Sequence, residues 1–294
     1  MVVKHLTYNE IDRTRWDATI ATSTNSLPYA YSWYLDAVSP QWEALVSNNY
    51  AFVMPLPVKR KFGVKYVIQP RWVQQLGVFS AQPITKEIVK SFLAKIPYLS
   101  YDFNINYANN FGEPKPNSLI DLSVDYATLK LAFSDNTKRN ITKAKKHKLL
   151  IQPIEIEEFV KIWSHENGDM PYELHTKLPL LCHAAKTNNV GGFYGVFSAK
   201  TQLIAALFTI ETEDRIIYLA PVSNAEGKQK SAMFLLIDFL LQNYAESGKI
   251  FDCEGSQIPG VARFYAGFGA QLQTYFRVSR CRPQWLVKLL NPSF

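Results

Sequence analysis

The sequence has few of the residues that build metal centres or disulfide frameworks. Of its 294 residues only three are cysteines, Cys182, Cys253 and Cys281, and they are widely spaced and odd in number. They therefore make neither a CxxC metal pair nor a disulfide framework, and a reducing cytoplasm fits them best. The five histidines occur in no HxxxH or HxE pattern, so we predict no structural or catalytic metal.

Long apolar stretches are also lacking. No run approaches the length of a membrane-spanning helix. The first residues, MVVKHLTYNEIDRTRW, do not contain the apolar core of an export signal. The sequence therefore predicts no transmembrane segment and favours a cytoplasmic protein.

What the sequence does contain is apolar residues and positive charge. Hydrophobic residues make up 47% and aromatic residues 14%, enough for well-buried cores, and the length favours two domains. The net charge of +7 favours anionic partners such as nucleotide phosphates, RNA or an anionic membrane surface. A solvated basic surface would explain the same charge.

The first half alternates predicted strands and helices. We expect helices over 31–38 and 85–96, and a hairpin of strands 50–58 and 64–68 around a basic turn. The stretch 109–117 contains Gly112, Pro114 and Pro116, which predicts an exposed loop. The first half therefore has the composition of a folded α/β domain.

A basic helical segment, SDNTKRNITKAKKHKLL, follows at residues 134–150. Ser134 is a candidate N-cap, and six cations and no acid lie between Lys138 and Lys148. Without acids one turn away, the helix gains nothing from internal ion pairs. Lys143 and Lys146 are therefore candidates for contacting RNA phosphates or a nucleotide-sugar diphosphate, with a solvated basic helix as the alternative. We place the domain boundary here, predicting domains over 1–133 and 134–294 with the basic segment 134–148 between them.

The second half has a regular order of predicted elements: a strand, two helices, three antiparallel strands, a polar loop, a helix, a strand, a short helix and a last strand. A tail helix is expected over 283–294. This order resembles the GNAT acyltransferase superfamily, and two segments carry the resemblance. They are the strand–loop–helix YLAPVSN-AEGKQKS-AMFLLIDFLL and the site helix ARFYAGFGA.

The resemblance implies a site for the pyrophosphate of acyl-CoA, such as acetyl-CoA, in the polar loop. Its residues here are Gly227, Lys228, Gln229, Lys230 and Ser231. Backbone N–H groups at a helix N-terminus favour bound anions. An ordinary solvated loop is the alternative interpretation.

The site helix supplies the candidate general acid. Tyr265 and Gly269 match the spacing of the superfamily's last helix, in which the tyrosine protonates the departing thiolate in many relatives. A phenol is protonated at neutral pH and can donate. The alternative is a core aromatic with a satisfied hydroxyl.

The chain also resembles the Fem-type peptidyltransferases, which are built from two GNAT-like domains in tandem. The segment KRNITKAKKHKL is similar to their R-x-x-I-x-K-A-x-K-x-G-L, with Lys148 in place of the glycine. RFYAGFGA is similar to their F-K-x-x-F-G, with Tyr265 where a lysine is common. The implied fold is α/β (α+β), with two domains of mixed, mainly antiparallel sheet flanked by helices.

Further candidates come from the residues around the site helix. Asp252 and Glu254 lie two apart on a predicted strand, 250–254, so both should point to one face. From there either carboxylate could orient or deprotonate an acceptor amine. Cys253 is expected to be a buried thiol rather than a nucleophile. Arg263 cannot share the face of Tyr265 and would bind an anionic group or pair with an acid.

A polar, aromatic cluster in the first half is the candidate acceptor pocket. It comprises Arg71, Trp72, Gln74 and Gln75, and the alternative is a structured turn that buries Trp72.

The resemblance thus implies transfer of an acyl or aminoacyl group from acyl-CoA or aminoacyl-tRNA to an amine of a small molecule or peptide, including peptides on a nucleotide-sugar. The alternative is an inactive GNAT-like module that binds a nucleotide or RNA.

Overall fold

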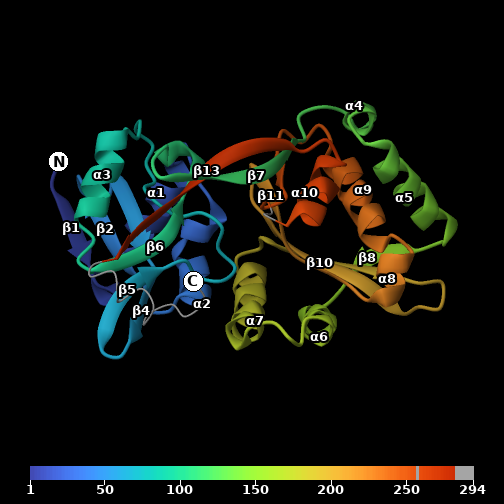
Figure 1. Cartoon of the computed structure of the whole chain (residues 1–294), viewed down its shortest axis with the longest axis horizontal. Helices are drawn as coiled ribbons and strands as arrows, with labels where there is room; N and C mark the ends of the chain where they lie inside the picture. Colours follow the sequence, from blue (N-terminus) through green and yellow to red (C-terminus); the bar gives the residue numbers. More distant parts are fainter. Residues whose placement is uncertain (256–257, 282–294) are drawn as a thin grey trace. The chain divides into compact units, whose positions relative to one another are not determined.

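The structure is a computed structural model, and it describes residues 1–255 and 258–281 (Figure 1). The chain has a mixed α/β fold and forms two compact units. Unit 1 is Met1–Lys115 together with the chain from Thr274, and unit 2 is Pro116–Gln273. The sequence placed its division between residues 133 and 134 instead. The expected tail helix over 283–294 lies outside the described residues.

The last strand explains why unit 1 is discontinuous in sequence. β13 (Gln271–Cys281) pairs antiparallel with β6 (Ser100–Ile105), with Cys281 opposite Ser100. Arg277 on β13 donates two hydrogen bonds to the carboxylate of Asp102 on β6, at 2.8 and 2.6 Å. The end of the chain therefore completes a sheet that begins in its first half.

The described part of unit 1 contains two sets of strands and three α-helices. In the first set the strand order is β1-β2-β3, all antiparallel; in the second, β4 pairs with β5, β5 with β6 and β6 with β13. The elements not yet given are β1 (Val3–Leu6), α1 (Arg13–Thr22), α2 (Ser32–Val38), β2 (Glu43–Ser47), β3 (Phe52–Leu56), β4 (Val58–Lys61), β5 (Val64–Ile68) and α3 (Lys86–Ala94), with 3₁₀ turns at Tyr8–Glu10, Pro28–Ala30 and Tyr107–Asn109.

The predicted helices over 31–38 and 85–96 are confirmed. The hairpin expected from strands 50–58 and 64–68 is wrong in its pairing, because β3, within the first stretch, pairs with β2. The partner of β5 is β4, formed in part by residues expected in the basic turn. The exposed loop expected over 109–117 is wrong in its second part, because β7 (Glu113–Asp121) already begins there. The ladder of β7 with the next strand, β12, runs only from Leu119 to Asp121. Pro114 and Pro116 lie before this ladder, so their missing N–H groups remove no hydrogen bond between β7 and β12.

Unit 2 follows the predicted order of elements. Its strands are ordered β7-β12-β11-β10-β9-β8, with β12 parallel to β11 and the other neighbours antiparallel. The elements are α4 (Tyr126–Leu131), α5 (Asp135–Lys146), β8 (Leu150–Pro153), α6 (Ile156–Glu166), α7 (Tyr172–Thr187), β9 (Gly191–Phe197), β10 (Leu203–Glu211), β11 (Arg215–Ser223), α8 (Ala225–Gln229), α9 (Ala232–Tyr244), β12 (Ile250–Asp252) and α10 (Pro259–Ala266).

Helices cover both faces of the sheet in unit 2 (Figure 1). Side chains alternate along a strand. On one face of the sheet, Leu207 of β10 packs in a hydrophobic cluster that includes residues of α9. On the other face, its neighbour Phe208 stacks on Phe193 of β9, with ring centroids 4.8 Å apart. Phe159 of α6 lies against both rings. Burial on both faces explains why β10 reads as an almost continuous apolar run.

Candidate active site

The candidate site lies where β11 and β12 part. The two strands pair at only three positions, from Arg215 opposite Ile250 to Ile217 opposite Asp252. Beyond Asp252 the chain stays with β7, because the Cys253 N–H donates to the Ser118 carbonyl at 2.9 Å. β11 continues to Ser223. Backbone groups on this edge of β11, beyond Ile217, are thus left without β12 as a partner.

A β-bulge lies at the same point. Phe208 of β10 faces Ala220, and the next residue, Thr209, faces Tyr218, so Leu219 of β11 has no opposite residue. A bulge twists a strand and redirects its backbone groups, and bulges are common beside active sites. The unpaired edge and the bulge together offer backbone donors and acceptors to an extended ligand.

Tyr265 lies beside this edge. Pro259 at the first position of α10 starts the helix, and the Tyr265 ring packs edge-on against Tyr218, with centroids 5.9 Å apart. The side chain is 7% exposed. Burial above all, then Cys253, Glu254 and Asp252, raises the pKa of its phenol well above the usual value. Tyr265 is therefore neutral and keeps its proton at neutral pH, and its catalytic role stays a prediction.

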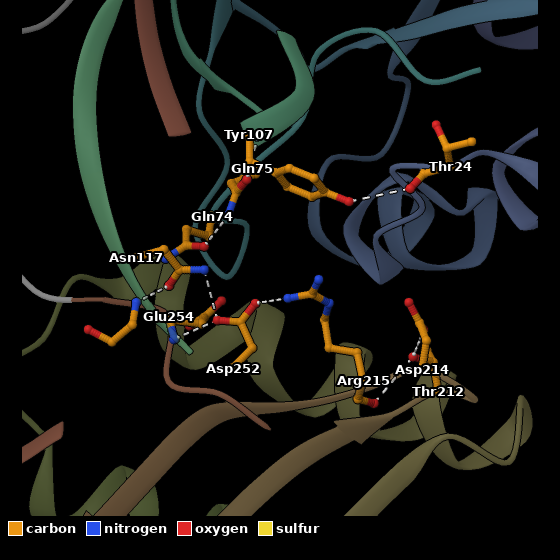
Figure 2. Close-up of polar contacts among 11 residues, drawn as sticks. Thr24, Gln74, Gln75, Tyr107, Asn117, Thr212, Asp214, Arg215, Asp252 and Glu254 are labelled. Atoms are coloured by element: carbon orange, nitrogen blue, oxygen red, sulfur yellow. Dashed lines mark hydrogen bonds and ion pairs between the residues drawn. The ribbon is translucent and has the colours of Figure 1, made fainter. Parts of the chain in front are cut away.

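Asp252 is fully buried in a network of hydrogen bonds (Figure 2). Its Oδ2 accepts from Nη1 of Arg215 at 2.6 Å. Its Oδ1 accepts from Nδ2 of Asn117 at 3.0 Å and from the backbone N–H of Glu254 at 2.9 Å. With both oxygens engaged, Asp252 orients its neighbours rather than offering a free base. The Nε of Arg215 is buried and has no hydrogen-bond partner in the described chain.

Glu254 does not continue the strand. β12 ends at Asp252, and Glu254 has a φ of 58°, in the left-handed region. The expectation that Asp252 and Glu254 share one face of a strand is wrong, because alternation stops where the backbone turns. Glu254 is partly exposed, and its catalytic role stays a prediction.

Cys253 is buried, as expected. Burial first, and then the neighbouring Asp252, raise the pKa of its thiol far above the usual value. A thiol held neutral is a poor nucleophile, so Cys253 belongs to the core beneath Tyr265.

The predicted phosphate loop is not an open loop. Asn224 caps the short helix α8 by accepting from the Gly227 N–H at 2.8 Å. The amides of Lys228, Lys230 and Ser231 donate to carbonyls within the same segment. The expectation that these N–H groups point outward is therefore wrong, because the helix already uses them.

The same segment is fixed by packing and pairing. A Cβ on Gly227 would come within 2.2 Å of the Ile204 carbonyl oxygen, so the glycine allows α8 to lie on β10. Lys230 pairs with Glu226 at 2.6 Å. The first amides of a helix have no acceptor within that helix. In this segment such amides belong to the start of α9, which follows α8 in the chain. Ser231 caps nothing there and instead donates to Oδ1 of Asn140 at 2.8 Å.

The basic segment forms α5, with Ser134 as its N-cap as predicted: the Ser134 hydroxyl accepts from the Thr137 N–H at 3.2 Å. Lys143 and Lys146 are exposed. Lys145 forms an ion pair with the buried Asp238 of α9 at 2.9 Å. One cation of the segment therefore joins two helices, and the others face solvent.

The remaining candidates do not gather at this site within unit 2. Arg263 is exposed, on the side of α10 away from the buried Tyr265, in line with the helical spacing. Arg71, Trp72, Gln74 and Gln75 belong to unit 1.

In unit 1 this cluster forms a structured turn. The amide of Gln75 donates to Gln74 at 2.6 Å and accepts from the Tyr107 N–H at 3.1 Å (Figure 2). Trp72 has a φ of 65° and its carbonyl accepts from the Tyr34 hydroxyl. Arg71 is exposed. The acceptor-binding role of these residues stays a prediction.

Sequence reasoning missed Arg215 and Asn117, which hold Asp252. Arg215 is separated from Asp252 by 37 positions, and Asn117 by 135. The available signal for Arg215 was its place at the start of an apolar strand, where an arginine is expected to be buried and to need an acidic partner. Asn117 had been assigned to a loop.

Comparison with known proteins agrees with this geometry. No protein-family model matches the sequence, and no curated protein matches it significantly. Solved structures do match. FemX, 11% identical, superposes over 99% of this chain and 100% of its own with a TM-score of 0.68. L-PGS from Bacillus licheniformis, 12% identical, matches over 95% of both chains with a TM-score of 0.58.

A tandem GNAT protein from the clavulanic acid biosynthesis pathway also matches. It is 11% identical, and the match covers 95% of this chain and 98% of that one with a TM-score of 0.50. The fold is therefore GNAT-like and related to that of Fem-type proteins, as the sequence predicted. At such low sequence identity these structural similarities establish the fold alone.

The described residues contain no group of three or more histidine, cysteine or acidic side chains placed to hold a metal ion. Within the same ranges, no helix has the length and apolar character needed to cross a membrane.

Proposed function

We propose that this protein transfers an acyl or aminoacyl group from a phosphate-bearing donor to an amine. One observation carries the proposal: the protonated phenol of Tyr265 lies beside a strand edge that lacks its neighbour beyond Ile217. The edge offers backbone groups to hold an extended donor and to polarise its carbonyl. The phenol supplies a proton to the leaving group.

The reaction needs no group beyond donor, acceptor and protein. The amine nitrogen attacks the donor carbonyl and forms a C–N bond, and the bond from that carbon to the leaving oxygen or sulfur breaks. The amine gives up a proton, for which Glu254 is the proposed acceptor. Tyr265 protonates the leaving atom. Orientation of the two substrates would provide much of the rate.

One observation favours an ester donor, as in aminoacyl-tRNA, over a CoA thioester: the amides expected to cradle the CoA pyrophosphate are engaged within α8. The exposed Lys143 and Lys146 would then face RNA phosphates.

Similar structures are consistent with this assignment, since they include FemX and L-PGS. The proposed acceptor is an amine of a small molecule or peptide. The proposed location is a reducing cytoplasm, supported by the buried free thiols of Cys182 and Cys253.

The test is a transfer assay with labelled aminoacyl-tRNA or acetyl-CoA and a panel of amine acceptors that includes UDP-sugar peptides. Tyr265→Phe should slow transfer by about a hundredfold, the lower range for loss of a general acid. It should change the free energy of unfolding by less than about 1 kcal/mol, because only a hydroxyl is removed. Thermal unfolding measured on the same samples separates the two effects.

Tyr101→Phe in unit 1 is the matched control. Tyr101 is also almost buried, and burial raises the pKa of its phenol too, but it lies outside the site. Its variant should transfer at the wild-type rate. Unchanged turnover in Tyr265→Phe would remove Tyr265 from the mechanism. Binding of tRNA without transfer to any acceptor would support the alternative, an inactive RNA-binding module.

A further inference from the structure

The β4–β5 hairpin in unit 1 has a composition that its own folding does not explain. Its strands pair from Val58 opposite Val67 to Lys61 opposite Val64, leaving Phe62 and Gly63 as a two-residue turn. Both turn residues have positive φ, 50° and 80°. Turns of this geometry favour asparagine or glycine, and a bulky aromatic residue at positive φ is strained.

Phe62 is also unusual in its exposure. The side chain is 76% exposed, so it gains nothing from a core, and the Lys61 ammonium lies 5.7 Å from its ring centroid. An exposed apolar residue in a strained position serves no purpose in the isolated fold. A contact with something outside the chain would give it one.

The strands on either side of the tip carry cations without acids. They are Lys59, Arg60, Lys61 and Lys65, and the sequence from Ala44 to Lys86 contains no aspartate or glutamate. Arg60 lies directly opposite Lys65, and like charges opposite one another destabilise a strand pair. Glu43 pairs with Lys65 at 2.8 Å and offsets one of these charges. A bound anion would offset the charge of Arg60, which faces Lys65 across the hairpin.

A cavity lies at the base of the hairpin, and Glu43 and neutral residues share its lining with the cations. Its volume is about 390 Å³, and Lys59, Arg60 and Lys65 contribute to its lining. Strands rise about 3.3 Å per residue, so these cations lie within roughly 10 Å of the tip along the chain. An apolar tip above a collar of cations matches the layers of a bilayer, in which acyl chains lie beneath anionic headgroups.

We propose that the β4–β5 hairpin docks this protein on an anionic lipid surface, with Phe62 entering the acyl-chain boundary and the flanking cations contacting headgroup phosphates. This inference does not depend on the acyl-transfer proposal, because it concerns unit 1 and is tested by binding alone. RNA is the other polyanion that such a surface could contact. Phe62 could stack on an RNA base, but a lipid surface fits better, because the apolar residue lies at the tip beyond the cations, in the order in which a bilayer presents acyl chains and headgroup phosphates.

The test is co-sedimentation of the full chain with vesicles of phosphatidylcholine alone or mixed with phosphatidylglycerol. Wild-type protein should bind the mixed vesicles and should bind neutral vesicles at least about tenfold more weakly, because neutral vesicles lack headgroup charge. Binding to the mixed vesicles should weaken as the salt concentration rises.

Two variants separate docking from folding. Arg60→Glu places an acid opposite Lys65 and should strengthen the strand pair, yet it should weaken vesicle binding by about tenfold or more. Phe62→Asn supplies a residue suited to the turn, yet it should weaken binding several-fold. Phe62→Trp should retain binding, since tryptophan favours the membrane interface.

The matched controls lie in unit 2. Lys161→Glu makes the same change in net charge at an exposed helical site, and Leu131→Ser removes an apolar side chain that is 80% exposed. Both should bind as wild type does. The proposal is overturned if wild type binds neither vesicle or both equally, or if the hairpin variants bind as wild type does. It is also overturned if those variants lose affinity only for an RNA oligonucleotide.

Discussion

The two units bury polar groups in different ways. Around the stretch 74–80 of unit 1 the buried network is made of neutral amides. Nδ2 of Asn106 donates to the carbonyls of Leu76 and Val78 at 2.8 and 3.1 Å. Oδ1 of Asn106 accepts from Nδ2 of Asn25 and of Asn109, each at 2.9 Å. In unit 2 the buried network is an ion pair, Arg215 with Asp252.

The difference matches what each unit is proposed to do. A satisfied network of amides fixes the stretch 74–80 and leaves no charge behind. The ion pair is costly to desolvate, and it retains a buried, unpartnered Nε on Arg215. It lies at the turn that leads to Glu254 and α10. Buried charge and an unsatisfied polar group are expected near an active site rather than in a part of the protein that only supports the fold.

The largest expected effect comes from breaking the ion pair. Arg215→Met leaves Asp252 buried and charged without its partner, and should lower the free energy of unfolding by about 3–5 kcal/mol. Urea denaturation near neutral pH measures it. In Arg215→Met/Asp252→Asn the charge is gone and Oδ1 can still accept from Asn117 and Glu254. The double variant should regain more than half of the loss; equal instability in both would show that the charge is not the cause.

The next effect comes from breaking the amide network. Asn106→Ala leaves several buried donors and acceptors unpaired, and should cost about 2–3 kcal/mol. Because no amide titrates, the cost should be the same at about pH 5 and about pH 8. Denaturation at both values tests this. A cost that changed strongly with pH would contradict the assignment of a neutral network to unit 1.

The smallest effect concerns Glu43, a buried carboxylate of unit 1 that accepts from several donors. Its oxygens accept from Lys65 at 2.8 Å, from His5 at 2.6 Å and from the Tyr98 hydroxyl. Burial is the largest single influence and raises the pKa of Glu43, but the three hydrogen bonds together bring that pKa below its usual value of 4.5. A lowered pKa stabilises the fold above the unfolded-state pKa, and this stabilisation is lost as pH falls through the folded-state value.

Wild-type stability should therefore fall through this group as pH drops below 4.5. Because Lys65 and His5 are partly exposed to solvent, the loss should be about 1 kcal/mol or less, the scale of solvent-exposed ion pairs. Glu43→Gln should give a flatter stability profile over the same acid range, measured as denaturation midpoints at a series of pH values. A profile as steep as that of wild type would assign the acid sensitivity to other carboxyls.

Much of unit 2 could be predicted because its signals are local. Apolar stretches separated by short polar turns marked β9, β10 and β11, and Ser134 marked the start of α5. Asn224 was an equally local signal, an N-cap before α8, yet the segment was interpreted as a phosphate loop. A glycine next to lysines suggests anion binding only while its amides are unused.

The rest depends on contacts between distant positions. The partners of Asp252 and the return of β13 to β6 come from chain folding, and no periodicity indicates which strand pairs with which. Tyr265 was found through spacing alone. Its neighbour Tyr218 and the unpaired edge of β11 became visible only with the strands in register.

The return of β13 also sets an order of events during synthesis. Residues of unit 1 leave the ribosome first, but β6 must wait for a partner that is translated after all of unit 2. Until then β6 has an open edge, the kind that recruits other chains. Unit 2 is continuous in sequence and can fold during that wait. A nascent or truncated chain ending before Thr274 would therefore hold a finished second unit and an aggregation-prone first one.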